Sequence, residues 1–273
     1  MAAICIETET KNPEVLRSRL MNQMETWRRS GLVQEYNETN TGAVTIWDCK
    51  TDSNHQAKNL QRLTAQVLAD YIVTELEPVL LRKLANLHHP HLIPKDLDEV
   101  CDRVRQRLIR EESLTGESRR QRIFRKIEQF LSEMGLINVD GFLRFRLQEY
   151  QRDLLIVINQ CADDFLIERE YQDFISLLRY FVEIQPARYP EVHVMRKQRD
   201  MIVYDPEFKV LHREAVRDIE GVDAIVSTLV TTAPKRVIVH VNQFSATDEL
   251  VTTIHSIFEE RVSLCLGCEH CND

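Results

Sequence analysis

The chain has 273 residues, of which 43% are hydrophobic and 29% are charged, and its formal net charge is −8. This composition excludes fibrous and intrinsically disordered proteins, and the length suits one large core or two unequal ones. The first residues lack the basic segment and apolar run of a signal peptide, and no apolar stretch approaches the length of a membrane span. We therefore expect a cytoplasmic protein without a membrane span, whose seven cysteines are reduced.

Residues 1–56 predict a small strand-helix-strand element. The apolar sequence AICIE at 3–7 favours a strand, and a helix is expected over 13–29, where Ser30 and Gly31 end it. A second strand, AVTIWD at 43–48, follows the turn residues before it.

Residues 57–185 have helical apolar periodicity almost throughout. Three prolines and two glycine-containing breaks divide this region: Pro78, Pro90, Pro94, Thr115-Gly116 and Met134-Gly135. The last stretch, 141–184, is too long for an ordinary globular helix, so we expect two helices or one kinked helix there.

Residues 186–273 change to a strand-rich pattern. EVHVMRK and MIVYD alternate around Gln198, Arg199 and Asp200, which predicts a hairpin, and a helix is expected at 222–232. The strand RVIVHV, a helix at 247–261 begun by Thr247, and the strand VSLCL then form a βαβ unit with parallel strands. The predicted fold class is α+β, with a mostly helical middle and a C-terminal α/β lobe.

The segment 265–271, CLGCEHC, carries three cysteines with C-x-x-C-x-x-C spacing. Thiolates at this spacing can reach one zinc ion at about 2.3 Å, so Cys265, Cys268 and Cys271 are candidate ligands. The fourth candidate is His240, brought near by the parallel strand pairing, or His270 within the motif. An iron–sulfur cluster is a lesser option because the usual fourth cysteine is missing. Thiol redox chemistry and a cysteine-rich end without function remain as alternatives.

A basic band covers residues 103–126, with nine basic and three acidic residues. Its net charge of +6 leaves the rest of the chain at −14. One interpretation is a solvated helix face that neutralises acidic neighbours. The other is a footprint for nucleic acid, in which Arg119, Arg120, Arg122 and Arg125 contact phosphates.

No other group of residues predicts a site as strongly as the cysteine motif or the basic band. A cluster of carboxylates is expected to form a solvated helix face, and adjacent histidines around a proline rarely converge on one metal ion. Phe142 and Phe145 are expected to be buried by an amphipathic helix rather than to stack on bases. The carboxylates are Asp163, Asp164, Glu168 and Glu170, and the histidines are His88, His89 and His91. No Gly-rich phosphate loop or nucleophile elbow occurs.

Five blocks in the C-terminal half resemble the YtxC-like family of sporulation proteins. They are GFLRFRLQEY at 141–150, EREYQDFISLLRYFV at 168–182, VHV at 192–194, DAIVSTLVTTAPKRVIVH at 223–240 and IFEERVSLCLGCEHC at 257–271. The resemblance implies a cytoplasmic protein of a spore-forming bacterium and brings no enzymatic activity with it. We expect a non-enzymatic binding or regulatory protein with a protein partner; nucleic-acid binding is the alternative.

Overall fold

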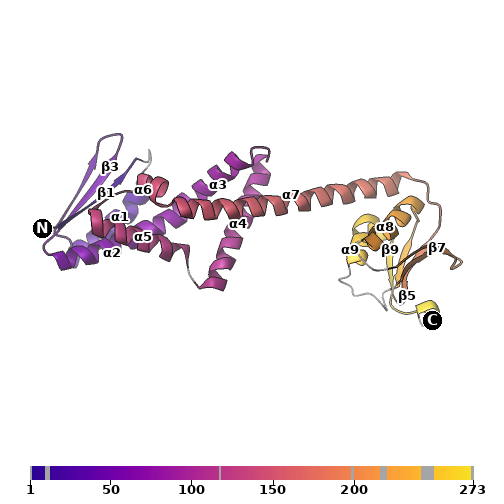
Figure 1. Ribbon diagram of the computed structural model, residues 1–273. Coiled ribbons are helices and arrows are strands. Elements are labelled where there is room, and N and C mark those ends of the chain that lie inside the picture. Colours follow the sequence, from indigo (N-terminus) through magenta and orange to yellow (C-terminus); the bar gives the residue numbers. More distant parts are fainter. Residues whose placement is uncertain are drawn as a thin grey trace. The chain divides into compact units, whose positions relative to one another are not determined.

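The computed structural model describes residues 2–9, 13–116, 118–197, 200–215, 220–240 and 249–271. The chain forms two compact units, Met1–Phe165 (unit 1) and Leu166–Asp273 (unit 2). Helices and strands occur in both, which confirms the expected α+β class (Figure 1). Three residues named in the predicted turn and helix cap, Gln198, Arg199 and Thr247, lie outside the described residues.

Unit 1 contains a four-stranded sheet in the order β2-β3-β1-β4. Strand β1 (Ala2–Thr8) is antiparallel to β3 (Thr45–Thr51) and parallel to β4 (Leu136–Asn138), and β2 (Glu35–Asn40) forms the other edge. The expected strands are confirmed, while β2 and β4 were not predicted. Alternate residues of β1 and β3, such as Ile6 and Trp47, are fully buried. The core beneath them also contains Leu16 and Leu20 of α1 (Glu14–Arg29).

Five further helices build unit 1: α2 (Asn54–Tyr71), α3 (Glu77–His88), α4 (Pro94–Thr115), α5 (Arg119–Met134) and α6 (Val139–Arg146). Helices α4 and α5 end at Gly116 and Gly135, whose φ angles of 70° and 66° are the left-handed conformation that glycine adopts without strain. The predicted breaks at these glycines are confirmed. Ser118 caps α5 by accepting the Gln121 N–H at 3.1 Å.

A π-helical turn, η1 (Ile72–Leu76), joins α2 to α3. Pro78 follows it closely and explains the wider turn, because proline has no N–H and its ring clashes with the carbonyl four residues earlier. The next residue after η1, Glu77, is 4% exposed and pairs with Arg119 at 2.7 Å. Burial raises the pKa of Glu77 to about 7, against the opposing effect of the Arg119 charge.

Helix α7 (Gln148–Ile184) is 37 residues long and includes the boundary between the two units. The expected break in 141–184 falls at Leu147, between α6 and α7. The longer of these two helices contains no proline or glycine. No helix in the described ranges combines the length and apolarity needed to cross a membrane.

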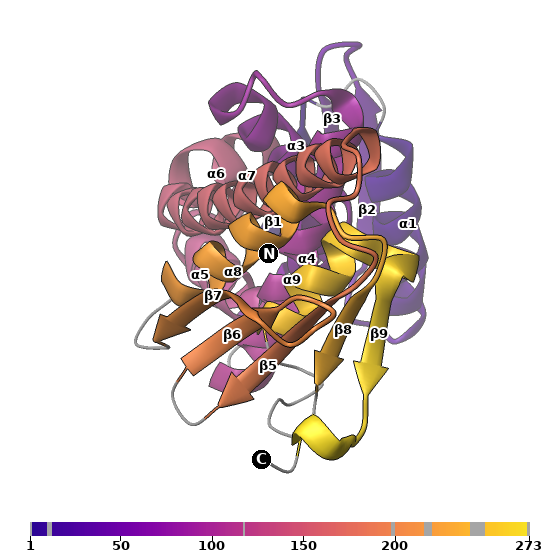
Figure 2. The same cartoon turned by 90° about the vertical axis from the view of Figure 1, so that its right-hand side faces the viewer.

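Unit 2 is built on a five-stranded sheet in the order β7-β6-β5-β8-β9 (Figure 2). Strands β5 (Val192–Lys197) and β6 (Asp200–Tyr204) form the predicted antiparallel hairpin, and β7 (Val210–Ala215) adds an edge that was not predicted. Strand β8 (Val237–His240) is parallel to both β5 and β9 (Val262–Cys265). The parallel strands of the βαβ prediction are therefore confirmed.

One face of this sheet packs against helices, and the other carries the histidines. Helices α8 (Glu220–Thr232) and α9 (Glu249–Phe258) and the last turns of α7 share a core with alternate strand residues, including Val194, Val203 and Val239. Side chains alternate between faces, so His193 and His240 lie on the opposite face. A small cluster of Met195, Ile202, Tyr204 and Phe208 packs beside them. Two 3₁₀ turns, η3 (Glu259–Arg261) and η4 (Glu269–Cys271), flank β9.

Candidate metal centre

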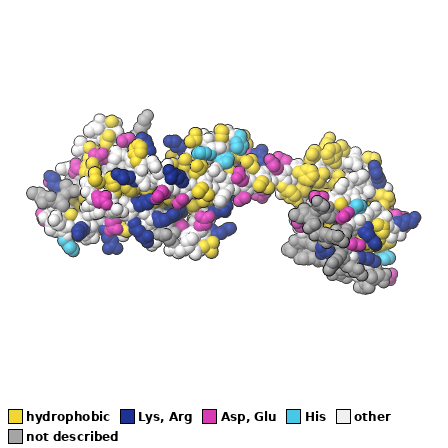
Figure 3. Space-filling model, viewed as in Figure 1, with side chains coloured by type: hydrophobic (Ala, Val, Ile, Leu, Met, Phe, Trp, Pro, Cys, Tyr) yellow, Lys and Arg dark blue, Asp and Glu magenta, His cyan; other side chains and the backbone are white. Residues whose placement is uncertain are grey.

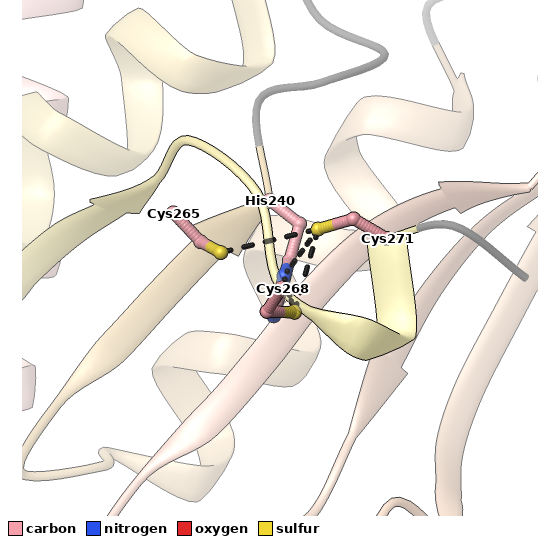
Figure 4. A group of neighbouring side chains, drawn as sticks. All are labelled: His240, Cys265, Cys268 and Cys271. Carbon is pink, nitrogen blue, oxygen red and sulfur yellow. Dashed lines mark hydrogen bonds between the residues drawn. The ribbon is translucent and has the colours of Figure 1, made fainter.

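His240 and Cys265 end two neighbouring parallel strands. The register of β8 and β9 places these residues side by side, as the βαβ topology predicted. The carboxyl ends of parallel strands are where α/β sheets commonly build sites, because the chain leaves the sheet there and its side chains converge. Figure 4 shows both side chains at this edge, with the following segment folded back towards them.

The residues after Cys265 return over the sheet edge and bring two more thiols to His240. The turn η4 is closed by the Cys271 N–H, which donates to the Cys268 carbonyl at 3.1 Å. The Nδ1 atom of His240 lies 3.2 Å from Cys271 Sγ and 3.5 Å from Cys268 Sγ. Cys271 Sγ is 3.5 Å from Cys268 Sγ and 3.9 Å from Cys265 Sγ.

The spacing of these four atoms suits a single small ion. All four lie within 4.8 Å of one another. A tetrahedral zinc site with bonds of about 2.3 Å to sulfur and 2.0 Å to nitrogen has ligand-to-ligand separations of about 3.5–3.8 Å. One nitrogen and three sulfurs also form a ligand set that zinc commonly takes in structural sites. The donor set and its geometry therefore fit a metal ion without rearrangement of the strands.

His240 presents a neutral ring to this group. It is 4% exposed, and burial, followed by the charges of His193 and His270, lowers its pKa to about 4. A neutral imidazole is the form that binds a metal, since coordination needs a ring-nitrogen lone pair. On the other side of the ring, His240 Nε2 lies 3.1 Å from His193 Nδ1.

The thiols differ in acidity although they lie close together. Burial acts to raise the pKa of Cys268, but hydrogen bonds with Cys271 and Cys265 outweigh it and lower this pKa below its ordinary value. Burial raises the pKa of Cys271 to about 11. Of these two thiols, Cys268 is the more readily ionised, and the thiolate is the form that binds a metal.

Phe208 covers the histidines from the β6–β7 turn. Its ring stacks on His193 at a centroid distance of 4.4 Å and on His270 at 3.7 Å. Its backbone has a φ of 56°. The turn is held by Asp205, whose Oδ1 accepts the N–H groups of Glu207 and Lys209 at 3.0 and 2.8 Å. His270, the other candidate fourth ligand, thus packs on Phe208 and is not one of the four grouped residues.

Three of the four arginines that were candidates for phosphate contacts pair with acidic neighbours. Arg119 is 8% exposed and binds Glu77 and Glu112, both at 2.7 Å. Arg120 pairs with Asp70 and Arg122 with Asp153 at 3.4 Å, and Arg125 also takes part in an interaction. Figure 3 shows basic and acidic side chains intermingled on the visible face of unit 1. This arrangement favours the neutralised helix face, and the phosphate-contact interpretation stays a prediction.

The remaining polar candidates do not converge on a site within the described residues. Asp164 faces Arg107 at 3.6 Å, while Asp163, Glu168 and Glu170 are exposed. Among the three histidines, His89 bonds through Nε2 to Asn159 Oδ1 at 3.0 Å.

The aromatic pair of α6 divides between core and surface. Phe142 is 4% exposed as expected, but the same expectation is wrong for Phe145, which is 63% exposed. The eight-residue helix α6 ends at Arg146, and Phe145 lies beside Arg144, whose guanidinium is 5.8 Å from the ring centroid. A helix this short turns only part of its circumference towards the core, so the second ring remains at the surface.

The profile of the YtxC-like family matches residues 62–263. The chain belongs to the YtxC-like family. The match includes His193 and His240, begins well before the region 141–271 that carried the resemblance, and ends just before Cys265.

One relative is the "Uncharacterized protein YtxC" of Bacillus subtilis (strain 168), which is 29% identical over 155 residues. The matched part is 54% of this chain and 54% of the relative, so the chain spans about half the length of this family member. No solved structure matches the chain.

Sequence reasoning found the four grouped residues but missed His193 and Phe208, which lie beside His240, and Glu191, which faces His193. His193 carried a signal that could have been used, because it lies in the strand that precedes the βαβ unit and alternates with buried valines. Phe208 carried none, since its role depends on the shape of the β6–β7 turn.

Proposed function

We propose that this protein binds one zinc ion through His240 Nδ1 and the thiolates of Cys265, Cys268 and Cys271. The observation that supports this most is the convergence of these four donor atoms within 4.8 Å. Three of the donors are soft thiolates, which favour zinc over the oxygen-seeking ions magnesium and calcium. In this role zinc would tie the segment after β9 to the end of β8.

A closed site of this kind suits a structural or sensing metal. Four protein ligands complete a tetrahedron, whereas catalytic zinc sites keep one position for water or substrate. An iron–sulfur cluster is a weaker fit because its ligands bind different irons and spread around a larger core. A thiol redox centre is also weaker, because Cys268 precedes only a three-residue turn and lacks a full helix whose dipole would lower its pKa.

The proposed biological role is that of a non-enzymatic binding or regulatory protein in sporulation, in the cytoplasm of a spore-forming bacterium. Family membership supports this setting, and the closed ligand set supports a role in binding rather than catalysis. Complementation of a deletion strain tests it: we expect wild type to restore spore yield and the Cys268→Ser variant to fail.

Elemental analysis of protein purified without chelator tests the metal directly. We expect about one zinc per chain in the wild type and a large loss in the Cys265→Ser, Cys268→Ser double variant. Cys5→Ala, which changes a partly exposed thiol in unit 1, is the matched control and should keep its zinc. Substoichiometric metal in the wild type, with an unfolding midpoint that chelator does not change, would contradict the proposal.

A further inference from the structure

We infer that His193 is a positioning residue of the metal centre: it accepts a hydrogen bond from His240 Nε2–H and thereby leaves the Nδ1 lone pair of His240 facing the three thiols. This inference rests on the proposed metal function. It assigns a role to a residue that is not itself a ligand, and it fixes which nitrogen of His240 binds the ion.

The two histidines meet because of the sheet register. His193 of β5 lies opposite Ile238 of β8, and His240 is two residues further along β8 on the same face. This diagonal relation brings His193 Nδ1 within 3.1 Å of His240 Nε2. Both side chains are buried, with exposed fractions of 7% and 4%, so solvent does not replace this bond.

The direction of the bond follows from Glu191. A neutral imidazole has one N–H and one lone pair, so the two rings can share the proton in two ways. His193 Nε2 faces the Glu191 carboxylate at 3.7 Å. A carboxylate only accepts hydrogen bonds, so it favours the proton on His193 Nε2 and the lone pair on His193 Nδ1. The proton between the rings then belongs to His240 Nε2.

The opposite arrangement is unfavourable at the Glu191 end and incompatible with metal binding at the other. It would place a lone pair of His193 towards the Glu191 carboxylate and a proton on His240 Nδ1, where three sulfurs converge. A protonated Nδ1 cannot bind a metal. The relay from Glu191 through His193 to His240 therefore resembles the carboxylate–histidine arrangements that orient ligands from outside a metal's own coordination sphere.

Phe208 keeps His193 in the orientation that this relay needs. Its ring lies 4.4 Å from the imidazole centroid at an interplanar angle of 28°. A ring held flat against Phe208 keeps its plane, and within that plane the hydrogen bond to His240 and the Glu191 carboxylate decide which nitrogen faces which group. His193 Nδ1 therefore stays directed at His240 and Nε2 at Glu191.

The first experiment reads the tautomers without metal. Full-length protein labelled with ¹⁵N-histidine is studied by long-range ¹H–¹⁵N NMR in the reduced, metal-free state, with His193→Leu and His240→Asn used for assignment. We expect the proton of His240 on Nε2 and that of His193 also on Nε2. A proton on His240 Nδ1 would overturn the inference. This readout does not depend on metal binding.

The second experiment measures zinc affinity by competition with a chromophoric chelator. We expect His193→Leu to bind zinc 10–100-fold more weakly, because the tautomer is no longer fixed. His193→Asn places an amide oxygen near the position of Nδ1 and should recover most of that loss. His255→Leu, an exposed histidine of α9, is the control and should bind as wild type does.

The two variants of His193 separate positioning from simple destabilisation. Unfolding of the metal-free variants shows whether each is folded before zinc is added. Wild-type affinity in His193→Leu, or equal losses in the Leu and Asn variants, would overturn the inference. Failure of wild type to bind zinc would instead remove the proposed function, and the NMR result would still decide the tautomer.

Discussion

Phe208 is a single side chain that joins three parts of unit 2. It reaches from the β6–β7 turn to His193 of β5 on one side and to His270 of η4 on the other. Its left-handed backbone, with a φ of 56°, is costly for a residue with a side chain. Because Phe208 has this backbone cost and contacts two histidines, we expect its ring to contribute to the stability of unit 2.

Replacing Phe208 with alanine should destabilise the metal-loaded protein by about 1–3 kcal/mol and weaken zinc binding. Alanine keeps a Cβ at the same positive φ, so the change removes the ring and leaves the backbone cost in place. Urea unfolding with and without chelator measures the effect. Phe145→Ala removes an exposed ring in unit 1 and should change stability by less than about 0.5 kcal/mol. Equal effects of the two substitutions would contradict this role.

At this scale, sequence was sufficient for some ligands and insufficient for their surroundings. Cys265 and His240 could be paired because two apolar strands flanking a helix imply parallel neighbours, and the structure confirms that pairing. The choice between His240 and His270 depended on how the segment after Cys265 folds back. That path includes the stacking of His270 on Phe208, a residue distant in sequence with no recognisable spacing.

The β6–β7 turn is the element that positions Phe208, and Asp205 is its main internal support. Asp205 is 8% exposed, and its Oδ1 accepts two backbone N–H groups of the turn. Its own N–H donates to the Lys209 carbonyl at 3.0 Å. The turn thus has a fixed shape, as expected where an aspartate side chain replaces a backbone acceptor.

Asp205→Ala leaves both N–H groups without that acceptor and should cost about 1–3 kcal/mol of stability. Asp205→Asn retains the amide oxygen at the Oδ1 position and should lose much less. Thermal unfolding of both variants measures the difference, and hydrogen exchange at the Glu207 and Lys209 amides localises it. Equal losses in the two variants would show that the negative charge, and not the turn hydrogen bonds, is what matters.

Glu77, placed directly after the π-helical turn, should make unit 1 sensitive to pH. Burial raises the pKa of this carboxyl from 4.5 to about 7 in the folded protein. Between these values the folded protein holds a proton that the unfolded chain has released, so stability falls as pH rises. The contribution is complete below about 4.5 and is lost as pH passes about 7.

Glu77→Gln should remove this pH dependence, because an amide mimics the protonated carboxyl and does not titrate. We expect the difference in the free energy of unfolding between wild type and variant to change by roughly 1–3 kcal/mol between pH 4.5 and 7. Urea unfolding measures it. Glu133 is exposed, so Glu133→Gln is the control and should leave the dependence of the unfolding free energy on pH unchanged. If Glu77→Gln keeps the pH dependence of the wild type, another group titrates.

Element-level prediction succeeded where apolar periodicity was strong. The breaks at Gly116 and Gly135, the β5–β6 hairpin and the parallel pair β8–β9 all follow from local pattern. Strand β2 was missed because EYNETN has no apolar residue except tyrosine, and β4 because it has three residues. Such edge strands form through backbone pairing with a neighbour, which local sequence does not encode.

At the scale of the whole molecule, the division into two units allows the effect of metal on the stability of each unit to be measured separately. Both tryptophans, Trp27 and Trp47, lie in unit 1, whereas the four residues of the proposed metal site lie in unit 2. Intrinsic tryptophan fluorescence therefore reports unit 1 alone. Calorimetry reports both units.

We expect a chelator to lower the midpoint of one calorimetric transition and to leave the tryptophan fluorescence transition unchanged. The reason is that metal binding stabilises only the unit that holds the ligands. The Cys265→Ser, Cys268→Ser variant without chelator should reproduce the shift. A fluorescence midpoint that moves together with the calorimetric one would show instead that the two units unfold as one.

The unit boundary itself illustrates what composition does not reveal. It falls between Phe165 and Leu166, inside a helix without proline or glycine, so no linker signal accompanies it. The α+β class could be predicted because each half of the chain has its own dominant period. The point where one core gives way to another depends on long-range contacts, which no single stretch displays.

The position of β9 in the sheet has a consequence for solubility. This strand has four residues, forms one border of the sheet, and ends in Cys265, a ligand of the proposed metal site. If zinc is lost, the tether at Cys265 is lost too, and so short a strand can detach from β8. The freed backbone of β8, with its apolar sequence VIVH, would then be open to pairing with strands of other molecules. Metal depletion should therefore promote aggregation by sheet extension well before the chain unfolds.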